Sequence, residues 1–505
     1  MITSKYIKTM SLALASLLMV SACDDGFEEL NKNPNGAEVA TPNLLLRNAI
    51  ESTVTRTHSV DLGGEIGSGW VQHMAKIQYT DEDRYIPRVG TMNNTWSSYY
   101  AASGKDFQTI IELATKAEHD NYKGIGMTMR TYNIAMLTDL FGDVPYTEAF
   151  KGDRGVASPK YDKQEDIYPM LIATLDTANS LLSEGGKEVD GDIMYDGDIE
   201  KWKKFTNSMA LRLMLRMSGK VDVSAGMRKI VNDPATYPIF TSNDDNATLF
   251  FLEASPDDHP IHTNRQTRDD HRISENLLNM LTDRDDSRKF VYMDVNGSNQ
   301  YAGIPNGLLS SKAAAYGLTN VSDMGPYFQA PDAPAPIMTF AELNFILAEA
   351  AKKGYIDGGD TKAQEYYEAG ITASFEQFEE PMQAVFDDMD GVHYGGANPA
   401  NFTTVAEEIA YYISINPYDA ANGLQLIAEQ KYLALFDQGL QAWFEWRRTG
   451  FPVLVPAEDG ANAGQIPVRL PYPSDEEGRN SSNVSEAVAR LAGGNTLNSK
   501  VWWDN

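Results

Sequence analysis

The sequence predicts a mainly α fold in which tetratricopeptide-like helical pairs support a loop-rich half. Apolar residues recur at helical spacing over stretches of one to two dozen residues, with Gly, Pro or Asp at their ends. Successive stretches form pairs without a strict sequence repeat, which is typical of a helical array whose consensus has decayed. Over about residues 231–336 the periodicity gives way to loops rich in Asp, Asn, Gly and Pro.

The first residues resemble an export signal that ends in a cysteine. Lys5 and Lys8 precede the apolar run 10–20, which is about half the roughly 20 residues that a membrane-spanning helix needs. Ser21 and Ala22 then precede the only cysteine of the chain, at position 23. This pattern is similar to a lipobox, so we expect cleavage before Cys23 and lipidation of its thiol. The alternative is an ordinary signal peptide with a chance cysteine.

Composition excludes several classes of function. If Cys23 is lipidated, the mature chain has no free thiol for catalysis, disulfides or metal binding. A formal net charge of −29 excludes nucleic acid as a partner, because binding it needs clustered Lys and Arg. The same acidity leaves the lipid chains as the attachment to the membrane. A hydrophobic content of 42% is ample for a folded core.

Helical periodicity begins near residue 43 and is predicted to continue to Tyr79. In the first half it then returns over four ranges, 96–117, 124–141, 167–182 and 199–217. In the second half it covers 340–353, 362–378 and 424–447. The last range has the most regular apolar stripe, so we predict one continuous helix there. Trp502 and Trp503, close to the C-terminus, are expected to dock onto the body of the protein.

These patterns predict the domain organisation. We expect a signal peptide over 1–22, a lipidated tether over 23–42 and a single domain over 43–505. Within this domain the helical scaffold covers about 43–230 and 337–450, and the loop-rich portion covers about 231–336 and 451–505.

Several motifs occur in order along nearly the whole chain. They are LNKNPN at 30–35, DLFGDVPY at 139–146, YAGIP at 301–305, AELNFILAEA at 341–350, WFEWRR at 443–448, IPVRLPYP at 466–473 and WWD at 502–504. The ordered set resembles the SusD/RagB family of outer-membrane nutrient-binding lipoproteins, in its SusD-like branch. One departure is Ser287, where the family usually has proline.

The resemblance implies a helical scaffold whose loop-rich half faces the ligand. Family members lie as a lid over a SusC-like TonB-dependent transporter barrel, capture an oligosaccharide or in some branches a peptide, and deliver it. The acidic residues Asp24, Asp25, Glu28 and Glu29 resemble the signal for display at the cell surface. The expected location is therefore the outer membrane, with a lipid anchor and exposure to the outside.

Candidate ligand-binding residues lie in loops. Sugar binding without catalysis needs aromatic faces and polar groups for the hydroxyls. The polar loop 79–85 supplies Tyr79, Arg84 and Tyr85, where relatives contribute an aromatic stacker and an arginine, although it lacks their tryptophan. The alternative is that Tyr79 covers a helix face and Arg84 pairs with Asp81.

Three further tyrosines could form a second aromatic wall, as the resemblance implies. Tyr301, Tyr316 and Tyr327 lie in the irregular half, and Tyr301 also belongs to a motif that can be structural. Trp70 and Trp96 lie on periodic helices and are predicted to be core residues.

Metal binding is not predicted, and neither is a cofactor. His259 and His262 lie three residues apart, but Pro260 disfavours a helix that would present them together. The acidic turns at 190–192 and 196–198 could supply oxygen ligands to calcium, although simple Asp-Gly turns explain them better.

Catalysis is not predicted either. Glu342 and Glu349 lie on one helix face, whereas a glycosidase places its carboxylates on opposite sides of the bond. Arg212 and Arg216 share another face and are expected to pair with Asp or Glu of a neighbouring helix. The leading hypothesis is non-enzymatic capture of oligosaccharide for a TonB-dependent transporter. The alternatives are a peptide ligand, a lipid-anchored glycoside hydrolase, or a purely structural assembly subunit.

Overall fold

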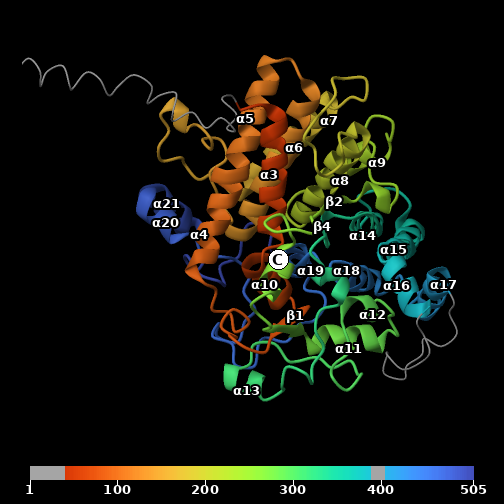
Figure 1. The fold of residues 1–505 in the computed structure, drawn as a ribbon. Helices are drawn as coiled ribbons and strands as arrows, with labels where there is room; N and C mark the ends of the chain where they lie inside the picture. Colours follow the sequence, from red (N-terminus) through yellow and green to blue (C-terminus); the bar gives the residue numbers. More distant parts are fainter. Residues whose placement is uncertain (1–39, 388–403, 505) are drawn as a thin grey trace, which may run out of the picture. The chain divides into compact units, whose positions relative to one another are not determined.

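Long helices build the first part of the protein. The computed structural model describes residues 40–387 and 404–504. The N-terminal helices are α3 (Pro42–Thr57), α4 (Val89–Ser97), α5 (Ser103–Lys116), α6 (Asp120–Phe141), α7 (Gln164–Leu181), α8 (Ile199–Met217) and α9 (Ser224–Val231). A π-helix, Val60–Ser68, follows α3, and a second one, Ser98–Ala102, joins α4 to α5. Helices α5, α6, α7 and α8 pack each against the next, as expected for a helical array (Figure 1).

Short elements and loops make up most of the next part, together with one strand that lies earlier, between α3 and α4. They are β1 (Met74–Lys76), β2 (Ala247–Phe250), α10 (Pro260–Arg265), β3 (His271–Ile273), α11 (Glu275–Asp283), α12 (Lys289–Tyr292), α13 (Ser310–Ala314) and β4 (Pro334–Met338). Strand β1 pairs antiparallel with β3, and β2 pairs antiparallel with β4. The described part of the chain holds only these two small sheets, so the predicted mainly α class is confirmed.

Helices resume after β4. They are α14 (Phe340–Lys352), α15 (Gly359–Glu376), α16 (Glu379–Asp387), α17 (Val405–Ile415), α18 (Gly423–Ala434), α19 (Gly439–Thr449), α20 (Ser474–Arg479) and α21 (Ser481–Arg490). Helix α14 packs against α15, α18 and α8, and so joins the second group of helices to the first.

The predicted single helix over 424–447 is wrong. Helix α18 ends at Ala434, and α19 begins at Gly439. The break lets α19 approach the π-helix Val60–Ser68 at backbone distance, because a Cβ on Gly439 would lie 2.3 Å from the amide nitrogen of Ser68. The apolar stripe indicated burial correctly, but it could not show that two backbones meet at this point.

The predicted continuation of the first helix to Tyr79 is also wrong. Helical structure ends near Trp70, and residues 74–76 form β1 instead. The strand forms because Lys76 pairs with His271 and Met74 with Ile273, nearly 200 residues further along the chain. Local periodicity cannot reveal such a distant partner.

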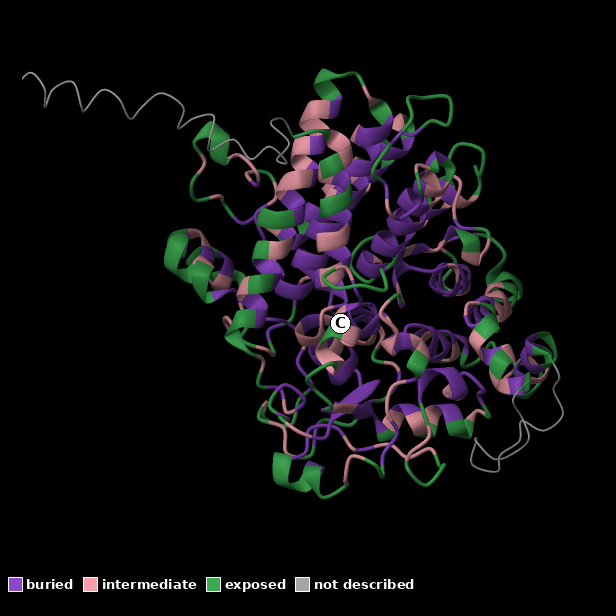
Figure 2. Cartoon of the chain, viewed as in Figure 1, coloured by how far each residue is buried: buried purple, intermediate pink, exposed green. Residues whose placement is uncertain are grey.

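One large apolar core runs through the helices, and a small one lies beneath the loops. Figure 2 shows the buried residues along the inward faces of the helices. Trp70 and Trp96 belong to the large core, as predicted. The small core lies under the loop-rich part and is made of Ala75, Ile77, Ile304, Leu308, Ala313 and Val321.

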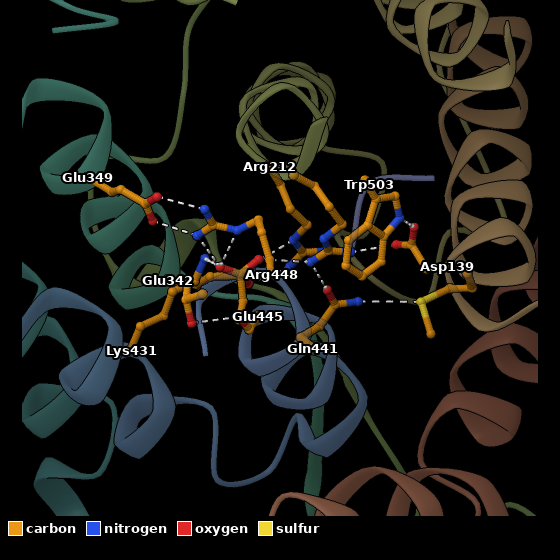
Figure 3. Close-up of polar contacts among 12 residues, drawn as sticks. Asp139, Arg212, Glu342, Glu349, Lys431, Gln441, Glu445, Arg448 and Trp503 are labelled. Atoms are coloured by element: carbon orange, nitrogen blue, oxygen red, sulfur yellow. Dashed lines mark hydrogen bonds and ion pairs between the residues drawn. The ribbon is translucent and has the colours of Figure 1, made fainter. Parts of the chain in front are cut away.

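Buried ion pairs cross-link the helices (Figure 3). Arg448 of α19 contacts both carboxylate oxygens of Glu349 on α14, at 2.6 and 2.5 Å. Glu445 of α19 lies 2.7 Å from Arg448 and 3.0 Å from Lys431 of α18. Burial alone would raise the pKa of Glu349, but the charge of Arg448 lowers it to about 2.

The two arginines of α8 join the same region. Arg216 contacts Asp139 of α6 at 2.6 Å and Glu445 at 3.3 Å, and Arg212 pairs with Glu342 of α14. The predicted pairing of both arginines with acidic residues of neighbouring helices is therefore confirmed.

The C-terminus docks onto this network, as predicted. Trp503 is buried and donates from its indole nitrogen to Asp139 at 2.8 Å. Asp504 forms an ion pair with Arg447 at 3.0 Å. Trp502 contacts Tyr168 of α7 at the rim of the core.

The expected signal peptide, Cys23 and most of the tether lie outside the described residues. Within 40–387 and 404–504, no helix is both long enough and apolar enough to cross a bilayer.

The ion network predicts a large cost for removing one partner. Glu349→Ala leaves a buried guanidinium without its bidentate partner, so we expect the free energy of unfolding to fall by about 3–5 kcal/mol. Urea denaturation measures it. Glu365→Ala breaks the exposed pair with Lys362 and is the control, with an expected loss below about 1 kcal/mol. Equal losses in the two variants would contradict the role of the network.

Three buried histidines predict a pH-dependent contribution to stability. Burial lowers the pKa of His58 to about 4 and those of His73 and His259 to about 3. Below about pH 6.5 the unfolded chain binds protons at these rings, whereas the folded chain does not. Each ring therefore lowers the free energy of unfolding as the pH falls. The buried carboxyls of Asp83 and Glu408, with pKa values raised to about 6 and 7, act in the opposite sense.

A difference between variants isolates one histidine. We expect the stability gap between the natural chain and His259→Gln to narrow below pH 6.5, by about 1.4 kcal/mol for each pH unit. Phe251→Leu changes a ring in contact with His259 but leaves His259 itself in place. The stability gap between this variant and the natural chain should therefore stay constant with pH. Urea denaturation between pH 7.5 and 4.5 measures both. A constant gap for His259→Gln would contradict the prediction.

Candidate functional site

The loop after β1 forms a tight structure with two left-handed residues. Tyr79 and Tyr85 have φ values of 51° and 69°. The amide of Ile86 donates to the carbonyl of Asp81 at 2.8 Å, which closes the loop. This backbone turns one tyrosine outward and the other into the protein.

Tyr85 is not available to a ligand, so its prediction as a stacking residue is corrected. Its ring is 4% exposed and packs edge-on against Trp70, with centroids 6.3 Å apart. Its hydroxyl accepts a hydrogen bond of 2.9 Å from the amide of Ala457. Burial raises the pKa of Tyr85 to about 12. The residue fastens the loop to the 451–465 segment instead of binding a ligand.

Tyr79 is the exposed aromatic residue of the loop. Its side chain is 61% exposed, and the guanidinium of Arg268 lies 4.8 Å from the ring centroid. The two side chains line a cavity of about 340 Å³, together with Asn264 and Arg88. We call this the Tyr79 cavity. Its size falls within the roughly 300–1,000 Å³ of small-ligand sites.

A buried charged cluster forms the floor of the Tyr79 cavity. The ammonium of Lys76 lies 2.6 Å from Glu65, 3.1 Å from Glu82 and 3.3 Å from Asp270. Although burial disfavours its charge, these carboxylates raise the pKa of Lys76 above its usual value. Arg88 adds a contact of 2.6 Å to Glu82. Each of the three carboxylates thus has an ion-pair partner within the protein.

The same cluster contains the donor set that could hold a metal. Ligand atoms of Glu65, Asp270 and His271 lie within 4.8 Å of one another. Lys76 fills the position that a cation would need, because its ammonium contacts both carboxylates. Burial would raise the pKa of Glu65, but the neighbouring His271 ring, 3.7 Å away, and the charge of Lys76 lower it to about 2.

The other predicted residues lie elsewhere. Arg84 donates to the carbonyl of Asp459 at 3.0 Å and lies 3.5 Å from Asp81, which is the structural alternative stated above. Tyr327 lines a different cavity, and Tyr301 packs near Phe290.

Tyr316 is 39% exposed and lines neither of these cavities, nor does Tyr301. The structure therefore does not bring the predicted tyrosines together at one site.

Sequence reasoning missed Arg268 and Asn264. Asn264 lies in α10, and Arg268 lies between α10 and β3; both line the cavity beside Tyr79, where β3 pairs with β1. The only sequence signal was a polar segment between two short apolar runs, which is common in any loop.

The residues considered for metal binding and catalysis have structural contacts. Pro260 begins α10 and His259 caps that helix from outside, so the helix does not present His259 and His262 together, as expected from the sequence. Asp192 accepts from the indole of Trp202 at 2.6 Å. Glu342 and Glu349 are each buried against an arginine.

A small cavity of about 60 Å³ lies beside His58 and Tyr132. It has room for a few waters but not for a sugar ring.

The protein has a scaffold of successively packed helices, and its loops form a polar cavity with an exposed aromatic ring. This combination is typical of helical-repeat proteins that bind ligands. The particular family follows from comparison with known proteins. Residues 34–473 match the SusD-like family model described as starch-binding and associating with the outer membrane. The chain therefore belongs to the SusD-like family. No curated protein matches it.

Solved structures have the same fold. A chitin-binding protein is 28% identical, with a TM-score of 0.78, over 92% of this chain and 100% of its own. A SusD homologue from Bacteroides fragilis is 24% identical, with a TM-score of 0.74, over 92% and 99% of the two chains. A chitin-binding SusD homologue from Flavobacterium johnsoniae is 24% identical, with a TM-score of 0.71, over 92% and 98%.

Proposed function

We propose that this protein is a cell-surface lipoprotein that binds oligosaccharide in the Tyr79 cavity and passes it, unchanged, to a SusC-like TonB-dependent transporter barrel. The observation that carries the proposal is the exposed ring of Tyr79, held at the mouth of a cavity of about 340 Å³ beside an arginine. The family description as starch-binding and the 28% identity to a chitin-binding protein support a glycan ligand.

The geometry suits binding of a sugar. An aromatic face can cover the apolar C–H side of a pyranose ring. Here the Arg268 guanidinium lies over one face of Tyr79 and fixes the orientation of the ring. The Arg268 guanidinium and the Asn264 amide offer donors and an acceptor to hydroxyl groups. Because the charged floor is already paired, the cavity can bind a neutral ligand without leaving a buried charge exposed to it.

The contacts around the cavity support binding of the ligand without catalysis. The carboxylates closest to the cavity, Glu65 and Glu82, are bound to Lys76 and Arg88. A glycosidase needs one carboxyl that gives up a proton and a second that stays free on the opposite side of the bond. These paired carboxylates are poorly suited to either role.

To deliver the ligand to a transporter barrel, the protein has to be attached to the membrane beside that barrel. The proposed lipid on Cys23 would keep the chain at the membrane, and the acidic residues after it would direct it to the outer face. Affinity purification of the full-length chain from outer membranes should recover a TonB-dependent barrel. Recovery of the chain without any barrel would contradict this part of the proposal.

Removing the Tyr79 ring should weaken glycan binding. We expect Tyr79→Ala to raise the Kd for the preferred oligosaccharide roughly tenfold, since about 1–2 kcal/mol of aromatic contact is lost. Tyr79→Phe, which keeps the stacking face, should bind nearly normally. Isothermal titration calorimetry with starch and chitin oligomers and with peptides, on the chain without residues 1–23, measures these affinities.

The panel also separates the alternatives. Saturable heat only with peptides would replace the glycan ligand by a peptide, and no heat at all would favour a structural subunit. The titration is repeated with Tyr301→Ala and Tyr316→Ala, which tests the remaining predicted tyrosines. Tyr85→Ala is unsuitable as a probe because it removes a buried ring.

Lipidation gives a further prediction. Cys23→Ser removes the acceptor thiol, so the chain should move from the membrane fraction to the soluble fraction, as measured by fractionation and immunoblotting. The matched variant Asp24→Asn/Asp25→Asn keeps the thiol and should stay with the membrane while losing accessibility to external protease. A Cys23→Ser chain that stays fully membrane-bound would exclude the lipid anchor.

A further inference from the structure

A second and larger cavity lies away from the Tyr79 cavity. It encloses about 800 Å³ and is lined by α3, the 192–196 loop, β2, β4 and the end of α15. Figure 1 places β2 and β4 close to α3, and contacts between α3 and β4 support this position. We call it the Phe250 cavity, after its most exposed aromatic residue. It shares no lining residue with the Tyr79 cavity.

Two aromatic rings, Phe250 and Tyr327, form part of its wall. Along β2, Ala247 and Leu249 point into the core, so Phe250 points outward and is 68% exposed. Tyr327 is half-buried and is fixed edge-on against Phe328 and Phe378, at 5.1 and 5.7 Å between centroids. Tyr327 therefore needs little reordering to receive a ligand, which lowers the entropic cost of binding.

Carboxylates form another part of the wall. Glu51 on α3 and Asp257 both line the cavity, and neither has an ion-pair partner among the residues that the structure describes. Burial, together with the charge of Asp257, raises the pKa of Glu51. A cationic group of a ligand can form charge-assisted hydrogen bonds with carboxylates that have no ion-pair partner in the protein.

Further acidic residues outweigh the basic ones in this cavity. Asp196, Asp244 and Glu376 also line it, and all three are exposed. Arg47 and Lys201 are the only basic residues of the lining. The wall therefore carries a net negative charge, in contrast to the Tyr79 cavity, whose carboxylates are paired internally.

We infer that the Phe250 cavity is a second binding site, which takes an oligosaccharide of amino sugars with free amines. Its ammonium groups would pair with Glu51 and Asp257, and the apolar faces of its rings would lie on Phe250 and Tyr327. Such a polymer carries a cation next to each ring face, which matches aromatic and acidic groups mixed within one cavity. The inference rests on the proposed function only in taking a glycan as the ligand.

The test uses three hexasaccharides and one peptide. The oligosaccharides are fully deacetylated chitosan hexamer, its N-acetylated form and a neutral glucose hexamer, and the peptide is hexalysine. Calorimetry at a pH where the amine is protonated should show saturable binding of the deacetylated hexamer, weakened by added salt. Asp257→Asn and Phe250→Ala should each raise its Kd roughly tenfold.

A matched control removes a charge close by. Glu253→Gln changes an exposed carboxylate of the same loop that does not line the cavity, so the Kd for the deacetylated hexamer should stay unchanged. Circular dichroism confirms that each variant is folded. Equal effects of Asp257→Asn and Glu253→Gln would reduce the result to a general charge effect and overturn the site.

The remaining outcomes are also decisive. No binding of the deacetylated hexamer, or equal binding of the N-acetylated form, would overturn the inference. Binding of hexalysine alone, sensitive to Asp257→Asn, would replace the amino sugar by a basic peptide. A neutral hexamer that binds equally well to the natural chain and to Tyr79→Ala would count against the proposed function, and leave the second site to be judged by its own variants.

Discussion

The buried ion network around Glu445 is the interaction on which the scaffold depends. Taking charges out of water costs several kcal/mol per ion, and the cost is recovered only when every group finds its partner. Glu445 meets Arg448, Lys431 and Arg216, which come from α19, α18 and α8. These helices therefore have to meet in one arrangement, and Asp139 and Glu349 extend the same requirement to α6 and α14.

This arrangement also positions the Tyr79 cavity. The backbone of α19 approaches the π-helix Val60–Ser68 closely at Gly439. The π-helix leads directly to β1, and Lys76 at the end of β1 anchors the carboxylates beneath Tyr79. The chain of contacts from the core to the binding loop is thus made of rigid backbone and paired charges, which keep an exposed ring in a fixed place.

The candidate site was predictable from the sequence only in part. Loop composition pointed to residues 79–85, and Tyr79 does face solvent at a cavity. The same composition could not distinguish Tyr79 from Tyr85, because the left-handed backbone at both positions is set by the closed loop and by the contact with Ala457. Arg268 could not be predicted at all, since its place beside Tyr79 depends on the pairing of β1 with β3.

The sequence by itself determined the helical class, most helix positions, the buried tryptophans and the pairing of Arg212 and Arg216 with acids. Each of these follows from side-chain spacing along one helix, which is a local property. Only the tertiary structure decided the break between α18 and α19, the strand β1, and the membership of the two cavities. Those features arise where distant segments meet, and contacts between distant segments leave no periodic signal in a single sequence.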